Sequence, residues 1–299
     1  MTAGNFTAWL KLELIFEGGR VDDPRDPGGR TAFGVTQRVY DGFRRNRGQP
    51  ARDVFRITSA EVAEIYRENY WKKVCGDQLP DGVDIVVGDG AINSGPSQSI
   101  KWLQRALGTV RVDGVMGDAT IAAARAHPDH DALIAAICDR RMAFLKALKT
   151  FRTYGKGWTS RVFQLRDAGQ GLATGAGMTD VRATYVADMS QPARLECAKK
   201  PPPKADAIWG AGAAGGALSQ IVDALTPTAE RVQLIGTVLA VITAVGAFLT
   251  VAGLVYRTWA AQRTAELNDA LDLRPVPMGS PDRLPSPAND DAPAAEGAA

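Results

Sequence analysis

The stretch from Glu17 to Thr36 reads E-G-G-R-V-D-D-P-R-D-P-G-G-R-T-A-F-G-V-T, and the rest of the chain is organised around it. Apolar residues recur with helical spacing just before this stretch, at Phe6, Leu10 and Leu14. The sequence therefore predicts a helix over Asn5–Phe16. Gly18-Gly19 ends the helix, because glycine adopts the left-handed conformation that a helix stop requires. Glu17 falls at a helix-to-loop corner, three residues further along the apolar stripe.

A carboxyl group among apolar neighbours has its charged form disfavoured, so we expect the pKa of Glu17 to be raised. An acid that stays protonated at the working pH can act as a general acid, which is the chemistry a glycosidase needs. The alternative is a solvated glutamate at the end of a helix.

A turn-rich loop follows the double glycine and carries a set of carboxylates and one hydroxyl, from Asp22, Asp23, Asp26 and Thr31. Asp26 lies nine residues after Glu17, so one short hairpin-like loop places a second carboxylate and a hydroxyl opposite the acid. Two carboxyls with room for a water between them form an inverting glycosidase site. The alternative is that the aspartates are turn residues, whose side chains bond their own backbone.

These residues carry a family resemblance. E-G-G followed by D-P-G-G-x-T-x-x-G-V-T resembles glycoside hydrolase family 108, the phage and prophage N-acetylmuramidases, over about residues 5–168. The resemblance implies Glu17 as proton donor, Asp26 as the carboxylate that positions water or stabilises charge, and Thr31 as a hydrogen-bonding partner of that water. Whether Asp22 or Asp23 takes the place of Asp26 stays open.

Three further residues are candidate substrate contacts. Thr58 and Glu61 form a capping-box signature, which predicts a helix from Ser59 to about Trp71. The helix ends in Tyr70-Trp71, where the family places an aromatic pair, and exposed aromatics stack on the apolar face of a sugar. Core aromatics are the alternative. Asn93 is a candidate contact for an N-acetyl group, or else an ordinary cap or turn residue.

The second half of this region contains Asp113–Thr120, D-G-V-M-G-D-A-T, which follows an L-Q helix and resembles small helical peptidoglycan-binding modules. In such a module the Asp-Gly turn and the threonine are expected to be architectural. A long helix is predicted from about Asp131 to Thr150. The expected fold is mainly α, with a lysozyme-like catalytic region over residues 1–88 and a peptidoglycan-binding-like helical region over 89–168.

The C-terminal part has a different composition. Residues 169–230 are rich in Gly, Ala, Thr and Pro and predict a flexible linker. Leu234–Tyr256 is 23 residues without a charge and spans roughly 34 Å as a helix, so a transmembrane helix is predicted over 231–258. The alternative is a buried core helix. Residues 259–299 are acidic and predict a disordered tail.

Charge and cysteine content limit the chemistry. The net charge of +2 combines an acidic tail of −5 from Glu266 onward with +7 over residues 1–265. A cationic body suits an anionic polymer. The sequence contains no basic run with interleaved aromatic residues, so nucleic-acid binding is not predicted. Three scattered cysteines and two histidines, His127 and His130, lack metal-site spacing, so we expect no metal and no cofactor.

The sequence thus predicts an endolysin-type N-acetylmuramidase, held at the bacterial inner membrane by its C-terminal helix and acting on the periplasmic cell wall for host lysis. Met1–Phe16 lacks the pattern of a cleavable signal peptide. The expected partners are peptidoglycan, the inner membrane and, as a candidate, a holin. The alternative function is a non-catalytic, membrane-anchored protein that binds peptidoglycan or takes part in secretion.

Overall fold

The computed structural model describes residues 5–16, 19–22, 29–176, 193–204 and 232–273; the other residues lie outside this description. The protein is mainly helical, as the sequence predicts. It divides into two compact units, one formed by the chain up to Ala198 and the other by Lys199–Leu273.

The first helix and a small sheet form the beginning of the first unit. Helix α1 covers Phe6–Phe16, which confirms the predicted helix. Over residues 5–14, whose side chains are described, those buried on α1 are Phe6, Trp9, Leu10, Leu12 and Glu13. Three antiparallel strands follow in the order β1-β2-β3, with bounds Arg20–Val21, Thr31–Ala32 and Val35–Thr36. The predicted hairpin therefore exists, and its loop is formed by residues 22–30.

Local capping explains where the next helices start. Thr36 begins α2 (Gln37–Arg45) by accepting a hydrogen bond from the Val39 backbone N–H. The predicted capping box of Thr58 and Glu61 begins α3 (Ser59–Tyr66). Three short turns complete this part: η1 (Val54–Arg56), the π-helical turn η2 (Arg67–Trp71) and η3 (Gly76–Gln78).

Helix α4 (Val83–Ser94) is the centre of the unit, because every residue from Val83 to Asn93 is buried. The sequence V-D-I-V-V-G-D-G-A-I-N has no polar face, and a helix of this kind is stable only when surrounded. Its glycines allow close packing: a Cβ added at Gly88 would lie 2.9 Å from Trp9 Nε1, and one at Gly90 would lie 2.5 Å from Ser99 Oγ.

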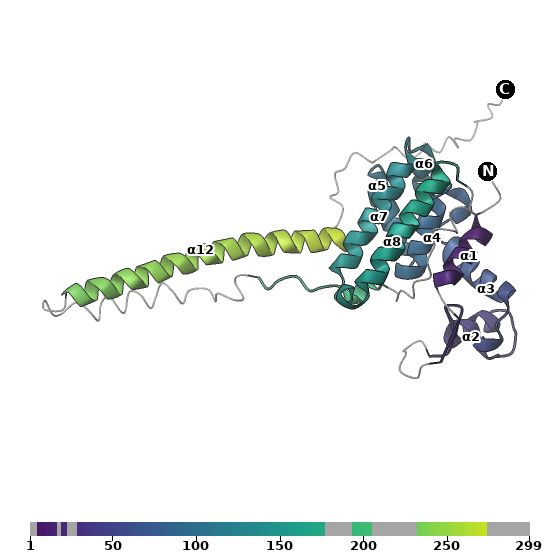
Figure 1. Cartoon of the computed structure of the whole chain (residues 1–299), viewed down its shortest axis with the longest axis horizontal. Coiled ribbons are helices and arrows are strands. Elements are labelled where there is room, and N and C mark those ends of the chain that lie inside the picture. Colours follow the sequence, from purple (N-terminus) through teal and green to yellow (C-terminus); the bar gives the residue numbers. More distant parts are fainter. Residues whose placement is uncertain (1–4, 17–18, 23–28, 177–192, 205–231, 274–299) are drawn as a thin grey trace, which may run out of the picture. The chain divides into compact units, whose positions relative to one another are not determined.

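The helices of the first unit that follow α4 are α5 (Pro96–Leu107), α6 (Asp118–Ala126), α7 (His130–Ala147) and α8 (Phe151–Ala173). Helices α1, α5, α7 and α8 pack against α4, whereas α6 packs against α5. Figure 1 shows α7 and α8 side by side, and only three residues join them, so the two helices are antiparallel. The long helix expected to reach Thr150 ends at Ala147, because Leu148 pairs with Ala198 instead.

The Asp113-Gly114 turn is organised by the buried side chain of Gln104. Its Oε1 accepts from the backbone N–H of Asp113 and of Gly114, at 3.0 and 2.9 Å. Its Nε2 donates to Asp113 Oδ1 and to the hydroxyl of Thr120. Gly114 has φ +74°, a conformation that favours glycine. The motif residues therefore bond one another, as expected of an architectural turn.

The observed boundaries differ from the expected ones. The boundary expected at 88/89 falls inside α4, because one buried helix serves both parts of the unit. Helix α8 runs to Ala173, into the expected linker, and residues 193–198 return to the unit: Ala193 N–H donates to Asn93 O at 2.9 Å and Lys149 N–H donates to Cys197 O at 2.8 Å. The short turn η4 covers Leu195–Cys197.

The second unit contains one long helix, α12, which covers Val232–Ala270 and is 39 residues long. It continues past Tyr256 into the part expected to be a disordered tail. The reason is that the following residues are rich in Ala, Arg, Gln, Glu and Leu, which are strong helix formers. Residues 274–299 lie outside the described part of the chain.

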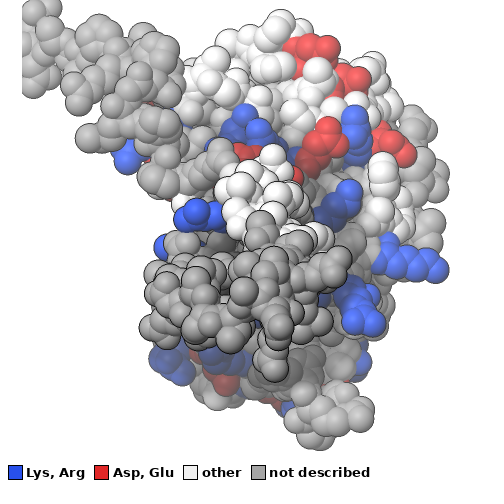
Figure 2. All heavy atoms as spheres, turned by 90° about the vertical axis from the view of Figure 1, so that its left-hand side faces the viewer, with Lys and Arg blue, Asp and Glu red and all other residues white. Residues whose placement is uncertain are grey.

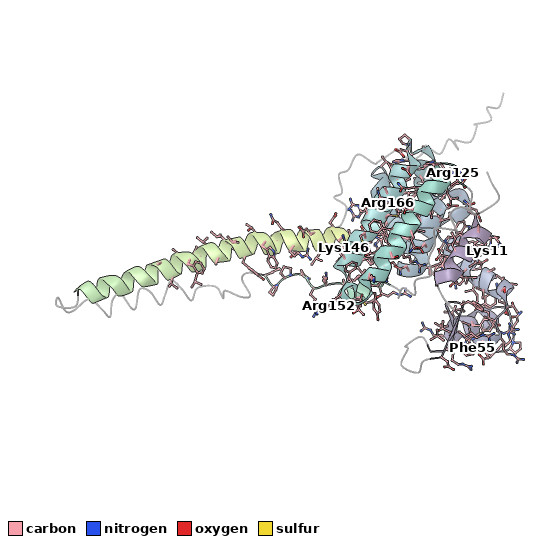
Figure 3. All side chains as sticks on the ribbon, viewed as in Figure 1. Lys11, Phe55, Arg125, Lys146, Arg152 and Arg166 are labelled. Carbon is pink, nitrogen blue, oxygen red and sulfur yellow. The ribbon has the colours of Figure 1, made fainter. Side chains whose placement is uncertain are left out.

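Basic side chains of the first unit are distributed over several helices. Figure 3 labels Lys11 on α1, Arg125 on α6, Lys146 on α7 and the pair Arg152 and Arg166 on α8. Figure 2 shows acidic side chains among the basic ones on the face that it draws. On that face, among the residues shown in colour, the two signs are mixed.

Candidate active site

The predicted catalytic residues are attached to α1 and to the β1–β2 hairpin. Glu17 follows the last residue of α1, and Asp26 belongs to the hairpin loop; both lie outside the described residues. Their roles stay predictions. The structure does describe the elements on either side of them, because α1 ends at Phe16, β1 begins at Arg20 and β2 begins at Thr31.

Thr31 is half-buried at the start of β2. Its backbone pairs with Val21 on one side and Thr36 on the other. The Thr31 hydroxyl donates to the carbonyl of Gly29 at 3.0 Å. Because this bond uses the only hydroxyl hydrogen, the oxygen lone pairs remain as acceptors for a further donor.

The turn between β2 and β3 attaches the small sheet to α3. Phe33 and Gly34 have φ +51° and +71°, and they are the two residues between β2 and β3. Positive φ at both positions matches the twist of two antiparallel strands. The hydroxyl of Tyr66 on α3 donates to Phe33 O at 3.0 Å. Hydrogen bonding to α3 thus supports a non-glycine residue in a left-handed conformation.

Arg30 fixes the carboxyl end of the hairpin loop. It forms ion pairs with Asp22 at 3.3 Å and with Asp53 at 2.8 Å, and its guanidinium lies 4.2 Å from the centre of the Phe55 ring. Asp22 therefore already has a cationic partner. Among the three loop aspartates that the sequence leaves open, Asp23 and Asp26 lie outside the described residues.

A partly buried ionic group joins α2 to α3. Glu61 forms ion pairs with Arg44 and Arg52 and accepts from the Tyr40 hydroxyl at 3.0 Å. Burial acts to raise the pKa of Glu61, but hydrogen bonds from Thr58 and Tyr40 and the charge of Arg52 outweigh it and hold the pKa below its ordinary value.

Trp71 does not fit the predicted sugar-stacking role. Its side chain is 0% exposed, and its ring lies 4.9 Å from that of Trp9 and 5.8 Å from that of Phe6. Its indole N–H donates to Asp77 Oδ1 at 2.8 Å. The cause is η2, in which Lys72 N–H bonds Arg67 O: a π-helical turn holds an extra residue and so changes which side chain faces the core. Tyr70 is half-buried, with its ring 5.6 Å from that of Tyr66.

Asn93 is only 3% exposed at the end of α4, so it does not present its side chain to a substrate in this conformation. The hydroxyl of Ser94 donates to Asn93 Oδ1 at 3.2 Å, and Ala193 covers the same end of α4. No local sequence pattern predicts this contact, because Ala193 is 100 positions further along the chain.

Helices α1 and α4 run parallel, which places their carboxyl ends together. The Asn5 side chain donates to Asp84 at 2.7 Å, Trp9 lies against Gly88, and Glu13 is joined to Asp89 through Arg161. Contacts thus advance along both helices in the same direction.

A cluster of four buried charges joins α1, α4, α7 and α8, and the sequence does not predict it. They are Glu13 on α1, Asp89 on α4, Arg141 on α7 and Arg161 on α8. Burial alone would raise the pKa of Asp89, but Arg141 and Arg161 outweigh it, and the pKa is held below its ordinary value. The available signal was a charged residue within an apolar run, as in L-K-L-E-L-I-F and V-V-G-D-G-A-I. Periodicity does not identify the partners.

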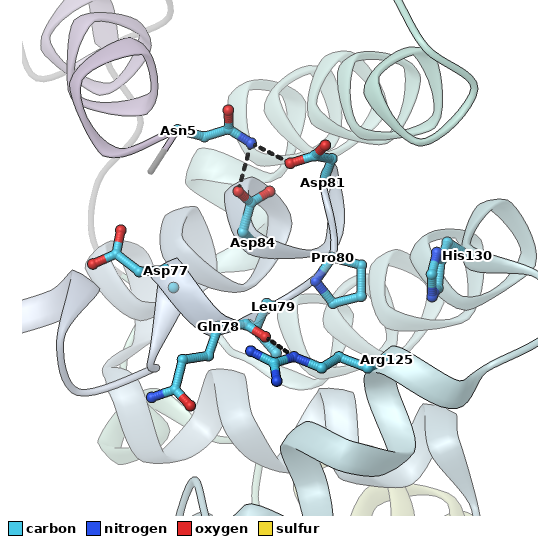
Figure 4. A pocket seen from close by; sticks show the side chains of 10 residues that line it. Asn5, Asp77, Gln78, Leu79, Pro80, Asp81, Asp84, Arg125 and His130 are labelled. Atoms are coloured by element: carbon cyan, nitrogen blue, oxygen red, sulfur yellow. Dashed lines mark hydrogen bonds between the residues drawn. The ribbon is translucent and has the colours of Figure 1, made fainter. Parts of the chain in front are cut away.

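A pocket of about 400 Å³ lies at the opposite end of α1 from Glu17. Figure 4 shows Asn5 between Asp81 and Asp84 on one wall, and Arg125, with its bond to Gln78 O, on another. Because α1 is 11 residues long, roughly 16 Å of helix separates this pocket from the predicted acid. It is therefore distinct from the candidate active site.

Among the described residues, no group of three or more His, Cys, Asp or Glu side chains is placed to hold a metal ion. The three cysteines are free thiols, and burial raises the pKa of Cys138 to about 12.

Comparison with known proteins identifies two family segments in this region. Residues 11–95 match the glycosyl hydrolase 108 family, and residues 98–163 match the predicted peptidoglycan domain. Among solved structures, the chain is similar to SagA of Brucella abortus, at 43% identity and a TM-score of 0.50, over 57% of this chain and 96% of that one. No curated protein matches the chain. This identity, over nearly the whole of that structure and with both segments in order, shows that the chain belongs to the glycosyl hydrolase 108 family and is a lysozyme-like glycoside hydrolase acting on peptidoglycan.

Proposed function

We propose that the protein is an N-acetylmuramidase that hydrolyses the β-1,4 bond between N-acetylmuramic acid and N-acetylglucosamine. The supporting observation is the connection of α1 to the β1–β2 hairpin. Three residues separate Phe16 from Arg20, and Asp26 belongs to the loop of that hairpin. The proposed acid and the proposed second carboxylate are thereby attached to the same small sheet.

In the proposed mechanism Glu17 protonates the glycosidic oxygen while a water attacks the opposite face of an oxocarbenium-like centre. Asp26 accepts a proton from this water, and the two carboxyls would need a separation of roughly 6.5–9.5 Å to leave room for it. Thr31 has its hydroxyl hydrogen bonded to Gly29, so its oxygen is available to accept the water's other hydrogen.

The Glu17→Gln variant tests the mechanism because it keeps the shape of the side chain and removes the proton. Purified peptidoglycan would be incubated with wild type, Glu17→Gln and the control Glu68→Gln, which alters an exposed glutamate paired with Lys72. We expect Glu17→Gln to lose at least about 100-fold in the release of reducing ends, the range of general acid catalysis, and the control to match wild type. Full activity of Glu17→Gln contradicts the assignment.

The second carboxylate is tested by two matched variants. Asp26→Asn should reduce turnover strongly, whereas Asp22→Asn should have a small effect because Asp22 is paired with Arg30. The reverse result assigns the role to Asp22. A wild-type protein that sediments with the wall without releasing any product supports the alternative, a non-catalytic peptidoglycan-binding protein.

We also propose that α12 tethers the enzyme to the bacterial inner membrane, from which it acts on the periplasmic wall during host lysis, with a holin as a candidate partner. The most apolar 18-residue window within residues 244–270 of α12 has a mean hydropathy of 1.3, and apolar side chains on the helix are exposed, with Phe248 at 72% and Val255 at 62%. One helix of this kind is compatible with a membrane span. The aromatic residues Tyr256 and Trp259 suit the membrane interface.

A further inference from the structure

The four buried charges connect the two family segments. Glu13 and Asp89 belong to residues 11–95, and Arg141 and Arg161 belong to residues 98–163. Their side chains are at most 1% exposed. Two acids and two arginines balance in charge, as a group enclosed at low dielectric requires.

Arg161 is the member that contacts both acids. Its Nη2 donates to Glu13 Oε2 at 2.7 Å and its Nε donates to Asp89 Oδ2 at 2.7 Å. Arg141 bonds the other oxygen of Asp89. The rigid fork of the guanidinium sets the angle between these bonds, so α1 is fixed relative to α4 and α8.

Stability alone does not explain this arrangement. Replacing a buried ionic group with well-packed apolar residues is often neutral or stabilising, because taking charges out of water is costly. What the group supplies is a defined position, and the position it defines is near the end of α1. Glu13 lies three residues before the last residue of α1, and Glu17 is bonded directly to that residue.

We propose that Arg161 is a positioning residue for glycoside hydrolysis: through Glu13 it sets the carboxyl end of α1 and hence the placement of Glu17. This rests on the proposed role of Glu17 as the general acid. It makes the segment that matches the peptidoglycan domain part of the catalytic apparatus. The carboxylate of Glu13 does not exchange a proton with substrate; it transmits the position of Arg161 to the helix.

The experiment uses the full chain and soluble, uncross-linked peptidoglycan strands. The central variant is Glu13→Met/Arg161→Met, which removes one charge of each sign and leaves Asp89 paired with Arg141. Glu13→Gln keeps an oxygen that accepts from Arg161 and serves as the conservative rescue. Arg166→Met is the matched control, because Arg166 lies on α8 and pairs with the exposed Asp139 at 3.1 Å.

We expect kcat of the double variant to fall about 10- to 100-fold while KM changes less than about threefold, because displacing a catalytic group by about 1 Å costs on this order. Glu13→Gln should recover most of kcat, and Arg166→Met should match wild type. The folded fraction of each variant is measured by near-ultraviolet circular dichroism, and kcat is expressed per folded molecule.

A kcat per folded molecule equal to that of wild type in the double variant overturns the inference, even where the folded fraction is reduced. A 10- to 100-fold rise in KM with unchanged kcat also overturns the inference, since that result points to a role in substrate binding. Failure of the proposed function looks different: the wild-type chain releases no reducing ends, or Glu17→Gln is as active as wild type.

Discussion

Asp84 gives a pH dependence of stability that can be calculated from its surroundings. It is 3% exposed at the start of α4. Burial, with a smaller contribution from the charge of Asp81, raises the pKa of Asp84 from 3.8 to about 7, against the opposing hydrogen bonds from Asn5 and the backbone of Ile85. The folded protein therefore holds this proton at pH values where the unfolded chain has released it.

The sign of the effect follows from this order of pKa values. The contribution of Asp84 to the free energy of unfolding is fully present below about pH 4 and is lost as the pH rises through about 7. The shift is about three pKa units, and at ~1.4 kcal/mol per unit the loss is on the order of 4 kcal/mol. Asp89 and Glu61 have lowered pKa values and act in the opposite direction.

The Asp84→Asn variant isolates this contribution because the amide does not titrate and its oxygen still accepts from Ile85 N–H. Urea unfolding of wild type and variant would be followed by tryptophan fluorescence between about pH 4 and pH 8. The difference in unfolding free energy between the two proteins cancels the contributions of Asp89 and Glu61. As the pH rises across this range, we expect the unfolding free energy of the variant to increase relative to that of wild type by on the order of 4 kcal/mol.

A second variant tests the stated cause. Asp81→Asn keeps Asp84 but removes a neighbouring charge that raises the pKa of Asp84. The pH at which the loss of stability is complete should therefore be lower than in wild type. A difference between Asp84→Asn and wild type that stays constant within about 1 kcal/mol from pH 4 to pH 8 would refute the reasoning, because one unit of pKa shift corresponds to ~1.4 kcal/mol.

Two further predictions concern packing and the membrane. Gly82→Ala should lower the unfolding free energy by about 3 kcal/mol or more, because Gly82 has φ +84° and a Cβ there would lie 2.2 Å from Gly169 O; Gly108→Ala, with φ +67° and open space around it, should cost only about 1 kcal/mol in the same urea titration. Phe248→Asp/Val251→Asp should release the chain from membranes under an alkaline carbonate wash, since each central charge opposes insertion by about 3 kcal/mol. Thr258→Asp/Gln262→Asp, beyond Arg257, is the control, and equal retention of both double variants would argue against the tether.

Local sequence determined the framework of the candidate site. The helix before Glu17, the hairpin loop, the capping box at Thr58 and the Asp113-Gly114 turn all depend on residues within a few positions of one another. Periodicity, glycine placement and capping chemistry describe such short-range geometry, and the structure confirms these elements. The roles of Glu17 and Asp26 remain predictions, because both lie outside the described residues.

Tertiary structure decided which side chains face the interior. Trp71 is buried because a π-helical turn changes its direction, and a pattern with a period of 3.6 residues contains no sign of that extra residue. Asn93 is covered by Ala193, which is 100 positions further along the chain. Arg161 meets Glu13 from 148 positions away. A buried charge needs a partner, but only the packing of α1, α4, α7 and α8 determines which residue supplies it.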